Sequence, residues 1–302
     1  MSERKRDYFF DPEAKRRYDY VVGVGKDLFT ESGLVIPGRQ ITEGDLKLIH
    51  NFHDAVAPTN PANPWRLQRE ERPVAKDPSF YANWELPGGP LEHINLAQAS
   101  AGKITEILQA NLRKKPKRNF SRIINLIRII DPYFVAAGAG LHDEGREVTH
   151  TYYTNEKIGE ILLTKMGIRP DFIGIMPDEQ IMLTPPDKDM NMVINRLSPE
   201  EVIVRLADEF GKRVPGTNRL YNPKDYSAWD RKKWMNGYLN KPDSGRPSER
   251  WMRRQMPLHV ENVPRYFGAL DKWVQSVSDL SLEQLVTMSN TELAPTLRPL
   301  DS

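Results

Sequence analysis

Residues 91–131 read LEHINLAQASAGKITEILQANLRKKPKRNFSRIINLIRIID, and this stretch decides the fold class. Apolar residues recur at helical spacing over Leu91–Leu112, until Pro116 interrupts the pattern. A second segment, Phe120–Asp131, is apolar over most of its circumference, which is typical of a helix in a protein core. The stretch therefore predicts two core helices joined by a basic loop.

Capping residues and periodicity predict further helices on both sides of this stretch. Thr42 and Asp45 form an N-cap pair ahead of an amphipathic segment that Pro58 ends. In Ser198-Pro199-Glu200-Glu201, Ser caps a helix, Pro takes its first position and Glu201 closes a capping box. The remaining predicted helices are Glu156–Met166, closed by Gly167, and residues 261–276 and 281–289.

A few short strands are expected beside the helices. Glu147–Thr154 is rich in β-branched and aromatic residues, and Asp171–Leu183 resembles a hairpin around Pro177-Asp178. Asp19–Gly25 indicates a short strand that ends in a glycine turn. The prediction is a mainly α protein with a helical core, a few short strands, long irregular connections and extended N- and C-terminal arms.

Composition sets the expected boundaries along the chain. Many of the 24 prolines lie in 57–90 and 213–258, and such density is incompatible with a helix interior or a central strand. We expect residues 1–40 to form an N-terminal arm, 41–290 the helical core with these two proline-rich connections, and 291–302 a loose C-terminal tail. Trp, Tyr and Arg in irregular segments favour contacts between subunits.

The residues that are absent exclude several classes of protein. With no cysteine, the chain has no disulfide scaffold, thiolate zinc site or cysteine nucleophile. The charged N-terminus predicts no secretory signal peptide. The longest apolar stretch, Ile123–Leu141, contains Arg128, Asp131 and Pro132, so we expect a buried helix and a turn and no membrane partner. The expected location is the cytoplasm or a virion.

Basic residues gather in two places although the net charge is only +2. Cations neutralise phosphates, and neighbouring aromatic rings stack on unpaired bases, so both clusters predict contact with a nucleic-acid backbone. The predicted binding residues are Arg113, Lys114, Lys115, Lys117, Arg118, Arg122 and Arg128 in the first cluster and Arg246, Arg250, Arg253 and Arg254 in the second.

These features together predict a non-enzymatic structural subunit of the capsid or nucleocapsid type. It would multimerise through its arms, with itself as one partner and RNA or another single-stranded nucleic acid as the other, and it would need no cofactor. A protein-only structural component of a large complex is an alternative reading, in which the basic clusters meet acidic partners.

A metal-dependent hydrolase is the second alternative. His50, His53 and Asp54 lie within one helical turn, and His142-Asp143-Glu144 with His150 forms another candidate ligand set. These sets resemble the His-Asp dipeptides of metal-dependent phosphohydrolases, whose histidine and carboxylate ligands hold ions that activate water. In the competing reading, His53 is a hydrogen-bonded histidine on an apolar face and the other groups are solvated.

Overall fold

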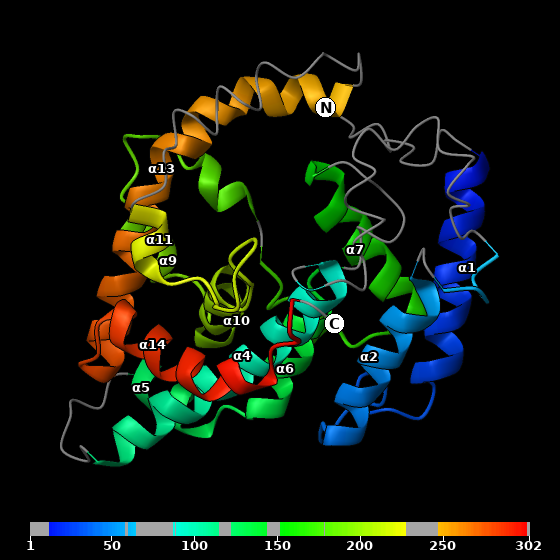
Figure 1. Cartoon of the computed structure of the whole chain (residues 1–302), viewed down its shortest axis with the longest axis horizontal. Coiled ribbons are helices and arrows are strands. Elements are labelled where there is room, and N and C mark those ends of the chain that lie inside the picture. Colours follow the sequence, from blue (N-terminus) through cyan, green and yellow to red (C-terminus); the bar gives the residue numbers. More distant parts are fainter. Residues whose placement is uncertain are drawn as a thin grey trace.

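Helices make up the regular structure of the described part of the chain (Figure 1). The computed structural model describes residues 12–57, 60–64, 87, 89–114, 122–143, 152–177, 179–227 and 247–300. The elements are α1 (Pro12–Phe29), α2 (Glu43–Val56), α4 (Pro90–Lys114), α5 (Arg122–Ile129), α6 (Pro132–Gly140), α7 (Tyr152–Met166), α8 (Pro170–Ile173), η2 (Glu179–Leu183), α9 (Met190–Ile194), α10 (Pro199–Phe210), α11 (Pro223–Ser227), α13 (Pro247–Ser278), α14 (Leu282–Leu293) and η3 (Ala294–Thr296).

Helix α6 occupies the centre of the molecule and belongs to both hydrophobic clusters. Asp131 caps its start and Pro132 takes the first turn, where a missing N–H costs nothing. Its residues from Val135 to Gly140 are all buried, and α2, α4 and α10 pack against it. The small side chains allow this close packing: a Cβ added at Gly138 would lie 2.5 Å from Ile175 Cδ1.

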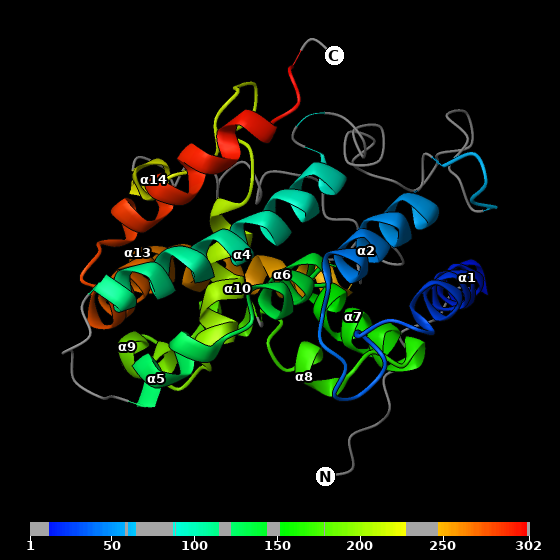
Figure 2. The same ribbon diagram turned by 90° about the horizontal axis from the view of Figure 1, so that it is seen from below.

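The larger cluster joins α4, α5, α6, α9, α10, α13 and α14. The amphipathic helix α10 presents Val202, Ile203, Leu206 and Phe210 to this core, and Ser198 accepts a hydrogen bond from the Glu201 N–H as its N-cap. Helix α14 lies alongside α4 (Figure 2), where Lys103 of α4 pairs with Glu292 of α14 at 2.7 Å. The predicted helices of this region are confirmed.

The smaller cluster packs α1, α2, α7 and α8 against the other side of α6. Thr42 and Asp45 form the predicted capping box of α2, and the Asp45 carboxylate also accepts the Gly33 N–H at 3.0 Å. Gly167 ends α7 with φ +84°, a left-handed conformation that glycine adopts without steric cost. These local predictions are confirmed.

The predicted strands are wrong where the structure describes them. Residues 19–25 lie inside helix α1, residues 152–154 begin helix α7, and 171–183 contain α8 and η2. Within the described ranges the chain has no β-strand, and an isolated antiparallel bridge pairs Arg213 with Leu220. Residues 147–151 and 178 lie outside the described residues. Strand propensity depends strongly on context, so short segments of this composition are compatible with helix.

The extended arms are corrected in the same way. Tyr18, Val21 and Phe29 of α1 are buried in the smaller cluster, so residues 12–40 fold onto their own chain. At the other end, Leu293 is buried against Leu96 and Leu220, and Leu297 packs on the same group. Residues 1–11 and 301–302 lie outside the described residues.

The proline-rich connection 213–258 is partly helical. It contains α11 and the first residues of α13, which continues through Pro257 and Pro264. Most of the connection 57–90 lies outside the described residues. None of the helices that the structure describes could cross a membrane alone by length and composition, and one bent pair, α5 with α6 at 85°, meets the test together.

Candidate metal centre

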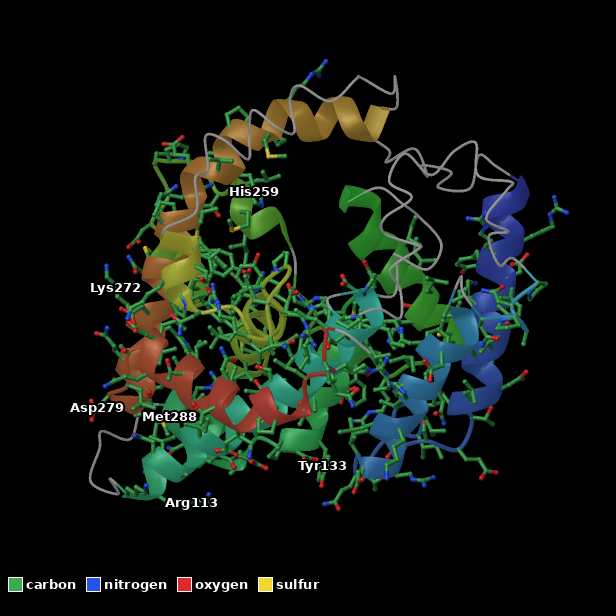
Figure 3. All side chains as sticks on the ribbon, in the orientation of Figure 1. Arg113, Tyr133, His259, Lys272, Asp279 and Met288 are labelled. Atoms are coloured by element: carbon green, nitrogen blue, oxygen red, sulfur yellow. The ribbon has the colours of Figure 1, made fainter. Side chains whose placement is uncertain are left out.

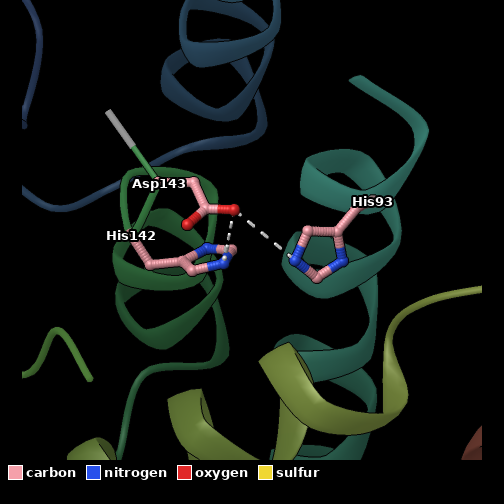
Figure 4. Close-up of side chains that lie close together, drawn as sticks. All are labelled: His93, His142 and Asp143. Atoms are coloured by element: carbon pink, nitrogen blue, oxygen red, sulfur yellow. Dashed lines mark ion pairs between the residues drawn. The ribbon is translucent and has the colours of Figure 1, made fainter. Parts of the chain in front are cut away.

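Two histidines and two aspartates converge where α4, α6 and α10 meet. His93 lies in the first turn of α4, His142 and Asp143 directly follow α6, and Asp208 lies in the last turn of α10. The Asp208 Oδ1 atom is 3.2 Å from both His93 Nε2 and His142 Nε2. The Asp143 Oδ2 atom is 3.3 Å from His142 Nε2 and 3.7 Å from His93 Nε2 (Figure 4).

Backbone carbonyls fix the orientation of both imidazole rings. His93 Nδ1 lies 3.2 Å from the Gly211 carbonyl, and His142 Nδ1 lies 2.5 Å from the Ala139 carbonyl. A carbonyl only accepts hydrogen bonds, so each Nδ1 carries a proton and donates it. Each Nε2 then faces the carboxylates. Histidines that bind metals have this arrangement, in which the second ring nitrogen is held by an outer hydrogen bond.

Glycine at position 211 allows α4 and the end of α10 to approach this closely. A Cβ on Gly211 would lie 2.4 Å from the Ala207 carbonyl oxygen and 2.7 Å from the Ala97 Cα. Real Cβ atoms do not approach backbone atoms so closely, so only glycine fits without a shift of one helix. The same glycine supplies the carbonyl that holds His93. This contact therefore sets the separation of His93 and Asp208.

The site is buried on one side and open on the other. His142 and Asp143 are 7% and 6% exposed, whereas the Asp208 side chain is 27% exposed. Burial opposes a charge on His142, but the carboxylates of Asp143 and Asp208 outweigh it and raise the pKa of His142 to about 10. Burial of Asp208 acts against its charged form too, and His142 nevertheless holds the pKa of Asp208 well below its usual range.

The donor atoms lie at distances that one divalent cation can span. His93, His142 and Asp143 each offer one ligand atom within 4.8 Å of the other two, and Asp208 Oδ1 lies 3.2 Å from both imidazoles. The donor set of two imidazoles and two carboxylates suits ions from Mn²⁺ to Zn²⁺. Despite burial, Asp143 and Asp208 raise the pKa of His142 to about 10, so an ion that binds here has to displace a proton from His142.

The two predicted metal sets have different outcomes. His142 and Asp143 lie in the site, whereas the set His50, His53 and Asp54 is not brought together around one position. His53 is fully buried, and its Nε2 donates to the Gly140 carbonyl at 2.9 Å, as the competing reading proposed. His50 is half-buried and pairs with Asp54 at 3.2 Å and with Asn95. Glu144 and His150 lie outside the described residues.

The prediction missed His93 and Asp208. Both lie on helices that the sequence predicts correctly, yet nothing in the local pattern connects either residue with His142-Asp143. Their meeting depends on how α4 and α10 pack against α6, which local spacing does not specify. The sequence signal that could have identified them is a potential metal ligand within a helix that is otherwise rich in buried apolar residues.

The basic clusters lie apart from this centre. Arg113 and Lys114 end α4 and are exposed, Arg122 on α5 is exposed, and Arg128 contacts Asn125 at 3.4 Å (Figure 3 labels Arg113). Arg113 is 20 residues from His93 along one helix, which corresponds to ~30 Å. Arg250, Arg253 and the exposed Arg254 lie on α13, while Lys115, Lys117, Arg118 and Arg246 lie outside the described residues.

Comparison with known proteins gives no match to a family model, to a curated protein or to a solved structure. The functional argument therefore depends on the chemistry of the centre itself.

Proposed function

We propose that this chain is a metal-dependent hydrolase whose cation is held by His93, His142, Asp143 and Asp208. One observation carries the proposal: the buried His142 and the partly buried His93, each anchored through Nδ1 to a backbone carbonyl, present Nε2 to two carboxylates at 3.2–3.7 Å. An ion that accepts more than four ligands, such as Mn²⁺ or Co²⁺, would bind a water in addition to these four side chains and would activate it for attack at neutral pH. This geometry favours the alternative reading of a metal-dependent hydrolase over that of a non-enzymatic protein as the function to test first.

Substrate would approach from the side of Asp208, which is the more exposed part of the site. Lys212 follows Asp208 by four residues, and its positive charge contributes to lowering the pKa of Asp208. Two carboxylates balance the charge of a divalent ion, and Lys212, which pairs with Glu209 at 3.3 Å, adds a cation on this side of the site. The likeness of His142-Asp143 to the dipeptides of phosphohydrolases favours a phosphate ester as the substrate.

Metal analysis of the full-length protein tests the proposal. We expect one divalent ion per chain after dialysis against Mn²⁺, Co²⁺ or Zn²⁺, and metal-dependent hydrolysis of a generic phosphate ester such as p-nitrophenyl phosphate. Asp208→Ala and His142→Ala should each abolish both. A wild-type protein that binds none of these ions would refute the proposal.

His50→Ala is the matched control. His50 and Asp54 form another His–Asp pair at 3.2 Å, but this pair is half-exposed on α2. Its replacement removes an imidazole beside a carboxylate without touching the four proposed ligands. Metal content and hydrolysis should therefore equal those of the wild type.

Nucleic-acid binding stays a separate proposal, supported by the exposed cations Arg113, Lys114 and Arg122 at one end of α4 and α5. The distance of ~30 Å along α4 separates this surface from the metal centre. Residues 12–40 and 291–300 pack on their own chain. They therefore give no support to an assembly built on extended arms. Basic-surface binding and hydrolysis can therefore be tested independently.

A further inference from the structure

The guanidinium of Arg213 connects three distant parts of the chain. Its Nε and Nη2 atoms donate to both carboxylate oxygens of Glu92, with Nε 2.8 Å from Oε2. Nη1 donates to the Thr217 carbonyl and to Asn218 Oδ1, and Nη2 also donates to the Arg298 carbonyl at 2.7 Å. All five N–H groups of the side chain thus have acceptors, and the side chain is 1% exposed.

The hydrogen-bond network around Arg213 lies next to the candidate metal centre along two chain segments. Glu92 directly precedes His93, and Arg213 follows Gly211 by two residues. The ion pair and the hydrogen bond from His93 to the Gly211 carbonyl therefore link the same two segments side by side. Movement of Arg213 would carry both the acceptor of His93 and the end of the helix that bears Asp208.

The C-terminal segment is the third part of the chain in the hydrogen-bond network around Arg213. The Arg298 carbonyl accepts from Nη2, and the preceding Leu297 packs on a cluster of Leu96, Leu220 and Leu293. Leu96 lies one turn after His93 on α4, and Leu220 lies in the turn that Arg213 opens. The docked segment thus holds the same two elements together from outside.

We infer that Glu92 and Arg213 are positioning residues for His93, and that docking of residues 294–300 is part of the support of the metal centre. This inference depends on the proposed function, since it concerns the same cation. Arginine suits the role because its planar fork engages a carboxylate with two parallel hydrogen bonds while three other donors remain available. Lysine offers a point charge and cannot hold these directions.

Titration of Co²⁺ into the full-length protein tests the inference, since its visible absorption reports the number and geometry of the ligands around the ion. Losing a group that contacts a metal ligand directly usually costs about ten- to a hundredfold in affinity. Arg213 acts on His93 through the neighbouring backbone, so Arg213→Lys should weaken Co²⁺ binding by up to about tenfold and should change the visible spectrum. Glu92→Gln should act in the same direction.

Arg169→Lys is the matched control, because Arg169 also joins a carboxylate and two carbonyls: Asp171, Gly33 and Arg39. It lies between Ile168 and Phe172 of the smaller cluster along the chain, away from the centre. Its replacement should lower the melting temperature but leave the Co²⁺ affinity and spectrum as in the wild type.

A second variant tests the inference if Arg213→Lys fails to fold. Leu297→Asp undocks the C-terminal segment by charging a half-buried surface position, and it should weaken Co²⁺ binding less than Arg213→Lys does. Unchanged Co²⁺ affinity in the folded variants overturns the positioning role while the proposed function stands. A wild-type protein without Co²⁺ affinity overturns both.

Discussion

His93 Nε2 lies 3.2 Å from Asp208 Oδ1, although the two residues belong to different helices, α4 and α10. No sequence pattern links them, and their contact exists because the backbones of the two helices touch at Gly211 and Ala97. The geometry of the candidate centre is therefore a property of helix packing. Changes in that packing should be visible in the centre.

Gly211→Ala tests this dependence. The new Cβ would lie 2.4 Å from the Ala207 carbonyl and 2.7 Å from Ala97 Cα, so one helix must move. Overpacking of this kind costs about 1–3 kcal/mol of unfolding free energy, measurable by urea denaturation. We expect metal affinity to fall as well, because His93 loses its distance to Asp208.

Gly268→Ala is the control for that substitution. Gly268 is exposed in the interior of α13, and a Cβ there would meet nothing within 4 Å. Alanine in such a position should raise the free energy of unfolding by about 0.5–1 kcal/mol and leave metal affinity unchanged. Equal behaviour of the two variants would contradict the packing argument.

His53→Ala separates a structural histidine from a metal ligand. His53 is fully buried and donates to the Gly140 carbonyl, which lies just before the His142-Asp143 pair. Its loss leaves that buried carbonyl without this donor, at a cost of about 1–3 kcal/mol in unfolding free energy. Elemental analysis should still find one metal ion per chain, whereas His142→Ala should contain none.

The stability of the metal-free protein should fall as the pH rises from about 7 to about 10. Burial disfavours the charged imidazole of His142, yet Asp143 and Asp208 raise its pKa from 6.5 to about 10. Because the pKa is higher in the folded state, the stabilisation is complete below pH 6.5 and disappears as the pH rises through about 10.

Urea denaturation in the presence of a chelator measures this slope. His142→Gln has no imidazole to titrate, so its unfolding free energy should lack the decrease between these pH values. A wild type and a variant with parallel pH profiles would show that His142 does not carry the second proton.

The sequence specified local structure well and tertiary contacts poorly. Thr42 and Ser198 were identified as N-caps because a cap depends on neighbours within one turn. The prediction misses helix α1 because Gly23 and Gly25 indicate a turn. In the structure Gly25 lies against Met166 within the helix, where a Cβ would lie 2.4 Å from the Met166 sulfur.

Two of the four residues of the candidate centre are predictable from the sequence for the same reason. His142 and Asp143 are neighbours in the chain and resemble the His-Asp dipeptide of phosphohydrolases. His93 and Asp208 join it only after α4 and α10 have packed on α6. Conversely, His50, His53 and Asp54 have good helical spacing, but His53 points into the core.

The basic surface makes a prediction that does not depend on the metal centre. Replacing Arg113, Lys114 and Arg122 by glutamate should weaken binding of a single-stranded oligonucleotide. Each lost phosphate contact should reduce the slope of log K against log salt by about 0.7. The control is Lys26→Glu, which changes an exposed cation on α1, and its salt dependence should match the wild type.

An unchanged slope in the triple variant would remove this surface as a binding site. Co²⁺ affinity should stay the same in every variant, because ~30 Å of helix separates Arg113 from His93.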